Sequence, residues 1–200
     1  MSAAQVKNEY IPRMRDHYAK NVVGEMMKND SFTSPMQVPR LLKIVLNMGV
    51  NDARDNAKAI DLAADDMAAI AGQKPQVRRA KKSISNFKLR EGMPIGVRVT
   101  LRGSRMYEFL DRLVNIVIPR IRDFQGLDGR RGFDGQGNYN LGLTDQYVFT
   151  EINMEKSPTP RGMNITFVTT AEKDAHAREF LERMGMPFKK AAPQKVEEKI

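Results

Sequence analysis

The chain of 200 residues contains no cysteine. This absence excludes disulfide bridges, thiolate metal sites and thiol nucleophiles. Histidine is also scarce, because only His17 and His176 are present, far apart and in no metal-ligand spacing. We interpret both histidines as surface residues of helices, and we expect neither a metal nor a cofactor.

Long apolar runs are missing as well. Residues 1–10 contain none, and the longest run, around residues 116–118, is far shorter than a membrane span. The sequence therefore predicts no secretory signal and no membrane partner. We expect a cytoplasmic location.

Nucleotide-binding motifs are incomplete. Six glycines lie between residues 126 and 142, but no Gly-Lys-Ser or Gly-Lys-Thr occurs, and Asn140 stands where a dinucleotide motif has a third glycine. The segment is better interpreted as a long structured loop. A phosphotransfer enzyme is a remote alternative, and we expect the chain not to be an enzyme.

Acidic residues are nearly absent between Gly72 and Arg105, where Glu91 is the only one. Outside this stretch acidic and basic residues are equal in number, so the whole net charge of +9 belongs to it. So local an excess indicates a polyanion site, although a solvated basic face is the alternative interpretation. The basic residues of the stretch are Lys74, Arg78, Arg79, Lys81, Lys82, Lys88, Arg90, Arg98, Arg102 and Arg105.

Turn-forming residues decide which polyanion is favoured. Pro75, Gly92, Pro94 and Gly96 interrupt the basic stretch, which therefore cannot form one basic amphipathic helix on a membrane. RNA or DNA is the better partner. Phe87 is the only aromatic residue there, so recognition by shape and backbone is favoured over base stacking.

Hydrophobic periodicity predicts an α+β fold with a largely antiparallel sheet. The expected helices cover residues 12–28, 56–71, 105–118 (with Ser104 as N-cap) and 174–184. The expected strands cover residues 41–49, 77–79, 84–89, 94–102, 147–152 and 163–170. We expect one domain over residues 1–190, with halves of about 30–88 and 89–185, and a flexible tail at 191–200.

Two strands have clearly different faces. One face of each is apolar, which predicts that helices cover it: Leu42, Ile44, Leu46 and Met48 in the first, and Ile95, Val97, Val99 and Leu101 in the second. The other side of the sheet would stay open and polar, with a basic loop projecting from it. The open side would carry Lys43, Asn47, Arg98, Thr100 and Arg102.

Six segments resemble a known family. They are LNMGV (46–50), AAIAGQKPQVRRAKKSISNFKLREG (68–92), PIGVRVTLRG (94–103), PRIRDFQGL (119–127), FDGQGNYNLGL (133–143) and RGMNITFVTTA (161–171). In collinear order over about residues 10–190, they are similar to the bacterial large-subunit ribosomal protein family "L five", which binds 5S rRNA.

The resemblance implies a place in the central protuberance, with large-subunit rRNA and other 5S-binding ribosomal proteins as neighbours. It implies that Asn47, Gln73, Thr100 and Arg102 face 5S rRNA, beside Lys43 and Arg98 on the open face. It also implies contact with P-site tRNA and an intersubunit bridge to a small-subunit head protein. The tRNA-side loop would comprise Pro75, Gln76, Val77, Arg78, Arg79, Ala80, Lys81 and Lys82.

Two functions of different classes remain open on the sequence. The first is a structural rRNA-binding protein of the ribosome. The alternative is a free regulatory module that binds RNA or DNA. Co-sedimentation with large ribosomal subunits would separate the two.

Overall fold

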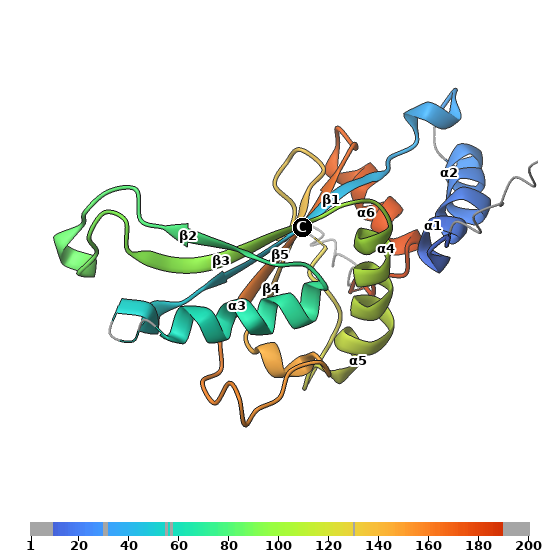
Figure 1. Ribbon diagram of the computed structural model, residues 1–200. Coiled ribbons are helices and arrows are strands. Elements are labelled where there is room, and N and C mark those ends of the chain that lie inside the picture. The colour runs from blue at the N-terminus through green and yellow to red at the C-terminus, as the bar shows by residue number, and fades with distance from the viewer. Residues whose placement is uncertain (1–9, 30–31, 55, 57, 130, 190–200) are drawn as a thin grey trace, which may run out of the picture.

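One antiparallel sheet organises the computed structural model, which describes residues 10–29, 32–54, 56, 58–129 and 131–189. Its strands within these residues are β1 (Leu41–Gly49), β2 (Gln76–Arg79), β3 (Pro94–Leu101), β4 (Tyr139–Leu143) and β5 (Met163–Thr169). They lie in the order β2-β3-β1-β5-β4, and every pairing is antiparallel (Figure 1). The predicted α+β class with an antiparallel sheet is confirmed. The predicted tail at 191–200 lies outside the described residues.

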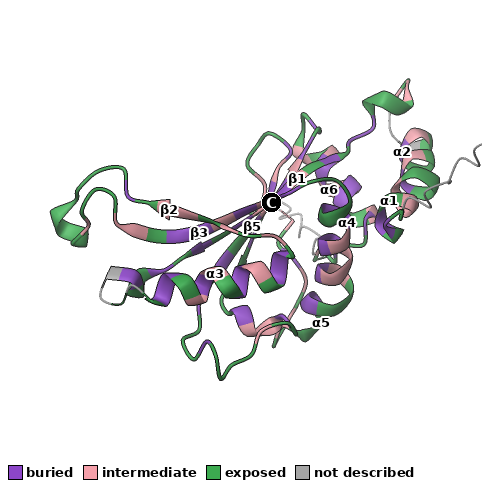
Figure 2. Cartoon of the chain, in the orientation of Figure 1, coloured by how far each residue is buried: buried purple, intermediate pink, exposed green. Residues whose placement is uncertain are grey.

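One face of the sheet forms the core. Ile44 lies opposite Leu101 on one neighbouring strand and Phe167 on the other, and all three are fully buried. Helices α3 (Lys58–Ala71) and α4 (Gly103–Arg112) contact the sheet at β3 and β1 respectively. Figure 2 shows the buried residues gathered between sheet and helices. Fully burying a side chain of this size stabilises the fold by about 1.5–3 kcal/mol, so this face sets the register.

The remaining helices agree with the predicted ranges. The first runs through α1 (Arg13–His17), the π-helical turn η1 (Tyr18–Val22) and α2 (Val23–Asn29), and the last is α6 (Asp174–Arg183). Helix α4 continues through the π-helical turn η5 (Leu113–Val117) into α5 (Ile118–Arg120). The prediction of Ser104 as N-cap is wrong, because Arg102 occupies that position and no side chain caps the helix there.

Strand β1 has the predicted bounds but not the predicted face throughout. The pairing of β1 with β5 shifts between Leu41 and Lys43, so Leu41 is buried and Leu42 is 43% exposed. An irregularity in register sends the next side chain to the other face. The inward orientation predicted for Leu42 is therefore wrong, whereas Ile44 is buried as expected.

The chain between β3 and β5 differs most from the predictions. Residues 139–143 form β4 inside the segment interpreted as a loop, whereas the strand expected at 147–152 is absent and a short 3-10 helix, Gln146–Val148, stands there. Tyr139 anchors β4, since its ring lies 4.8 Å from that of Phe133 and 5.3 Å from that of Phe188. Burial raises the pKa of Tyr139 to about 12. Aromatic packing thus outweighs the low strand preference of the glycines around it.

The hairpin of β2 and β3 projects from the molecule. We call residues 76–97 the arm and residues 80–93 the arm tip; the arm extends past the N-terminal end of α3 (Figure 1). The tip is held by backbone bonds from Ala80 N to Met93 O (2.8 Å) and from Gly92 N to Ala80 O (3.0 Å). The strand expected at 84–89 is instead a tight turn, in which one bridge between Ile84 and Leu89 encloses a single turn of 3-10 helix.

Candidate nucleic-acid interface

The open face of the sheet brings together four of the predicted binding residues. Asn47 on β1 lies opposite Arg98 on β3, and Val45 lies opposite Thr100. Because alternate residues share a face, Lys43, Asn47, Arg98 and Thr100 all lie opposite the buried side. Asn47 is exposed and the other three are partly exposed. The predicted split between an apolar and a polar face is thus present.

The same face continues onto two strands whose polar residues the sequence analysis missed. Asn47 is also opposite Asn164 on β5, and Thr166 is opposite Asn140 on β4. The Thr166 hydroxyl donates to Oδ1 of Asn140 at 2.7 Å. The alternation in residues 163–169 was the available signal for Asn164 and Thr166. Asn140 could not be found without the unpredicted strand β4.

Gln73 and Arg102 lie beside the sheet rather than on it. Gln73 follows α3, and its Oε1 accepts a weak hydrogen bond from Nη1 of Arg105 (3.5 Å). Arg102 directly follows β3 and is exposed. Both residues therefore lie where the α3–β2 connection meets the start of α4.

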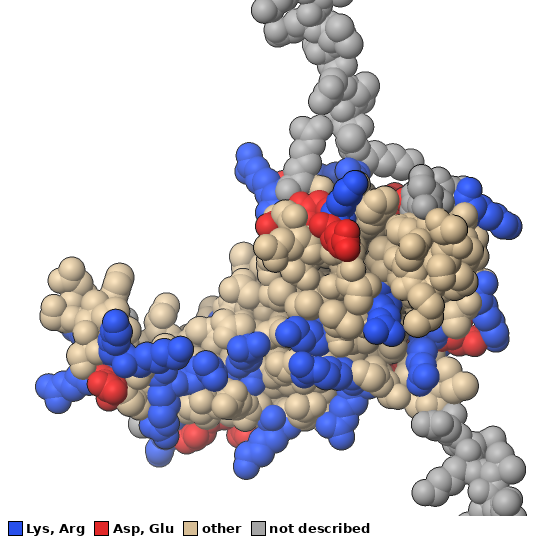
Figure 3. Space-filling model, turned by 90° about the horizontal axis from the view of Figure 1, so that it is seen from above, with Lys and Arg blue, Asp and Glu red and all other residues tan. Residues whose placement is uncertain are grey.

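Charge on the sheet has one sign. The five strands contain Lys43, Arg78, Arg79 and Arg98 but no Asp or Glu. Seen from the side away from α3, Lys and Arg side chains form a band from the arm across the sheet (Figure 3). A surface of this kind attracts phosphates and releases their counterions on binding. Its amides and hydroxyls can donate to phosphate, sugar or base edges.

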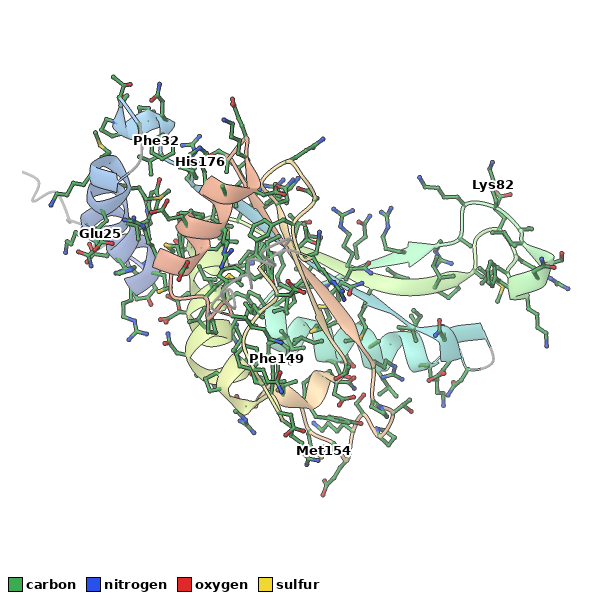
Figure 4. All side chains as sticks on the ribbon, turned by 180° about the vertical axis from the view of Figure 1, so that it is seen from behind. Glu25, Phe32, Lys82, Phe149, Met154 and His176 are labelled. Atoms are coloured by element: carbon green, nitrogen blue, oxygen red, sulfur yellow. The ribbon has the colours of Figure 1, made fainter. Side chains whose placement is uncertain are left out.

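The predicted tRNA-side loop is only partly a loop. Gln76, Val77, Arg78 and Arg79 form β2 and pair with β3, whereas Pro75 precedes the strand and Ala80, Lys81 and Lys82 follow it. Residues 76–79 form a strand because Val77 packs, partly buried, against the core, and pairing with β3 satisfies the hydrogen bonds of the backbone. Lys82 lies on the outer part of the arm, as its label in Figure 4 shows.

Two carboxylates of the protein, one in the glycine-rich loop and one at the start of α6, occupy the backbone donors of this loop. The backbone N–H groups of Gly135 and Gly137 donate to Asp174 at 3.1 and 2.8 Å. Those of Gln136 and Asn138 donate to Oδ1 of Asp134 at 2.9 and 3.1 Å. Four successive donors that a phosphate would need are therefore occupied, which argues against a nucleotide site here.

Each of the two histidines contacts another part of the protein. Nε2 of His17 lies 3.1 Å from the carbonyl oxygen of Arg183. The ring of His176 lies 5.2 Å from that of Phe32 (Figure 4). Among the described residues no group of three or more His, Cys, Asp or Glu side chains could hold a metal ion. None of the helices in that part of the chain is long and apolar enough to cross a membrane.

Comparison with family models matches most of the chain. Residues 34–90 match the model described as ribosomal protein L5. Residues 94–188 match the model described as the C-terminus of the same ribosomal protein family. The boundary between the two matches falls at the arm tip, immediately before β3.

Curated relatives cover nearly the whole chain. A protein of Salinispora tropica is 58% identical over 179 residues, which are 90% of this chain and 94% of its own length. Proteins of Corynebacterium urealyticum and Brevibacillus brevis are each 54% identical, over 92% and 89% of this chain and 95% and 98% of their own lengths. All three are named large ribosomal subunit protein uL5. The chain therefore belongs to the L5 family of large-subunit ribosomal proteins, which are structural constituents of the cytoplasmic ribosome and not enzymes.

Proposed function

We propose that the open face binds 5S rRNA within the large subunit and helps to attach it in the central protuberance. The observation that carries this proposal is the juxtaposition of Asn47 and Arg98 on a sheet face without acidic residues. Asn47 and Thr100 supply hydrogen bonds, and Lys43 and Arg98 supply charge. Gln73 and Arg102 extend the contact toward α4.

Substitution of the polar residues tests this surface. We expect Asn47→Ala and Thr100→Val each to weaken 5S rRNA binding by about 1–3 kcal/mol, because buried hydrogen bonds to RNA are lost. Neither change should alter the fold, since both side chains lie outside the core. Isothermal titration with purified 5S rRNA measures the affinity. Gln125→Ala, an exposed amide on the segment after α5, is the matched control and should bind normally. Normal binding by Asn47→Ala would remove the open face from the proposal.

Salt dependence tests the charged part independently. Each phosphate contact contributes a slope of about 0.7–0.9 to the fall of log affinity with log salt. We expect Lys43→Gln to reduce the slope by about one contact, whereas Asn47→Ala should leave it unchanged. Lys28→Gln, an exposed lysine on α2, should leave both slope and affinity unchanged. A wild-type affinity that does not change with salt would contradict binding through phosphates.

The arm and the remaining surfaces complete the proposal. The basic arm tip contacts P-site tRNA, because Lys81 and Lys82 lie on a projection away from the sheet face that holds 5S rRNA. The glycine-rich region and its neighbours take part in an intersubunit bridge to a small-subunit head protein. Other 5S-binding ribosomal proteins and large-subunit rRNA surround the complex. A free regulatory module would instead remain at the top of a sucrose gradient while large subunits sediment.

A further inference from the structure

The arm has an apolar side that the helices do not cover. Ile95 has the same orientation as Val97 and Val99, since alternate residues of a strand share a face. Val97 and Val99 are buried, but Ile95 is 36% exposed because the arm extends past the N-terminal end of α3 (Figure 1). The apolar face that the helices cover in the body of the sheet is thus exposed to solvent along the arm.

The arm tip carries further exposed apolar groups. Phe87 is 62% exposed and Ile84 is 44% exposed. Phe87, Leu89 and Ile95 line a hollow of about 460 Å³ together with Val50 and Asn51 at the end of β1. Burying an exposed aromatic ring of this kind stabilises an interface, so a hollow bordered by Phe87 is suited to a flat partner.

The charge of the arm tip indicates the chemical class of that partner. Four basic residues lie in the arm tip, and Glu91 is its only acid: the basic residues are Lys81, Lys82, Lys88 and Arg90. An aromatic ring within a basic segment is the arrangement by which proteins hold the backbone of single-stranded nucleic acid and stack on its bases. An apolar segment of another protein would not explain the surrounding positive charge.

We propose that Phe87 stacks on an unpaired nucleobase of ribosomal RNA at this hollow. Ribosomal RNA is favoured over tRNA because apolar contacts are typical of permanent interfaces, whereas transient ones are more polar. A tRNA that leaves in each cycle would expose the ring repeatedly. The proposal depends on membership of the large subunit, not on the assignment of 5S rRNA to the open face.

Variants at Phe87 separate stacking from simple apolar packing. Phe87→Tyr keeps an aromatic ring, and Phe87→Leu keeps apolar bulk without one. Met154→Leu is the matched control, because Met154 is also 62% exposed but lies on a loop across α3 from the arm (Figure 4). Large subunits are assembled with each variant, and the accessibility of every base is measured by chemical probing, with and without P-site tRNA.

The expected result is one base of 5S or the larger rRNA whose protection depends on the ring. It should be protected in the wild type, Phe87→Tyr and Met154→Leu, and about tenfold more reactive in Phe87→Leu, in keeping with the usual strength of base–aromatic stacking. Equal protection in Phe87→Leu and Phe87→Tyr overturns stacking. A ring-dependent base found in tRNA overturns the assignment to ribosomal RNA.

Discussion

At the scale of single residues, Asp134 organises the turn before β4. Its carboxylate accepts hydrogen bonds from Gln136 N, from Asn138 N and from Asn138 Nδ2, the last at 2.7 Å. Burial raises the pKa of this carboxyl, but the hydrogen bonds from Asn138 and Gln136 outweigh it and lower the pKa below its usual value. The charged form is therefore the one that the fold stabilises.

This lowered pKa predicts acid sensitivity of the loop. The stabilising contribution of Asp134 is fully present above the unfolded pKa of about 3.9 and is lost as pH falls through the lower, folded value. We expect the protection factors of residues 133–138, which are amide exchange rates corrected for the intrinsic effect of pH, to fall in that acid range in the wild type. Asp134→Asn should exchange faster at neutral pH and respond less to acid. An identical pH response in the two proteins would contradict the role of the charge.

A second residue-scale feature is a charge pair inside the fold. Nη1 of Arg161 lies 4.0 Å from Oδ2 of Asp66, and the side chains are 6% and 11% exposed. Nη1 of Arg161 also donates to the Ser157 hydroxyl at 3.1 Å, and the backbone N–H of Arg161 donates to Oε1 of Gln146. This network fixes the irregular segment 146–161 against α3, where a strand was predicted at residues 147–152.

Removal of one partner of this pair should be costly. Arg161→Leu leaves the Asp66 carboxylate buried without its counter-charge, and we expect a loss of about 3 kcal/mol in the free energy of unfolding. The double variant Asp66→Leu/Arg161→Leu should lose less than Arg161→Leu alone, because no isolated charge remains. Urea denaturation measures both. Lys156→Leu, on the same segment but exposed, should change stability by less than about 0.5 kcal/mol.

At the scale of elements, the sequence predicted what periodicity controls. Strand β1 has the predicted bounds of residues 41–49, and α3, α4 and α6 lie within the predicted ranges or begin or end within two residues of them. Strand β4 could not be predicted, because Gly142 and the flanking glycines lower strand preference locally. The packing of Tyr139 against nearby Phe133 and against Phe188, which is distant in sequence, outweighs this preference.

Residues of the candidate site were likewise predictable where the alternation of a strand places them, and not where tertiary packing does. The residues of β1 and β3 on the open face were predictable, because each strand has a clean alternation. The alternation of β5 also marks Asn164 as a polar-face residue, but its position beside Asn47 could not be predicted, because the pairing of β1 with β5 is set by the tertiary fold. The exposure of Phe87 also depends on where α3 begins relative to the arm, which no local pattern records.

The arm tip is an element that can be removed cleanly. Gly92 N donates to Ala80 O, which is the bond that a two-residue turn would close. We expect replacement of residues 81–91 by Asn-Gly to preserve β2, β3 and the binding of 5S rRNA through the open face. P-site tRNA retention by ribosomes that carry this variant should fall, because the tip carries the basic side chains proposed to contact tRNA. Filter binding measures retention, and loss of 5S rRNA binding with normal tRNA retention would reverse the two surfaces.

At the scale of the whole molecule, the two halves of the chain share one sheet. Strands β1 and β2 come from the first half, but they are not neighbours, since β3 lies between them. Strand β1 pairs on both sides with strands of the second half, β3 and β5. The family-model boundary near residues 90–94 is therefore not a boundary between independently packed bodies. We propose that the described chain is a single folding unit.

Fragments test this unit. A fragment of residues 1–93 retains β1 and β2 but can form none of the strand pairs of the native sheet, so its apolar face, including Ile44 and Leu46, has no partner strand. We expect it to be largely unfolded alone, as judged by circular dichroism and rapid amide exchange, because isolated strands cannot offset their conformational entropy. A fragment of residues 94–200 keeps the β4–β5 pair but has lost β1 from the centre of the sheet, and should also unfold without a cooperative transition. Mixing the two should restore native-like exchange protection in β1, because both of its neighbours then return. A cooperative thermal transition in the 1–93 fragment alone would show that the first half is an independent domain.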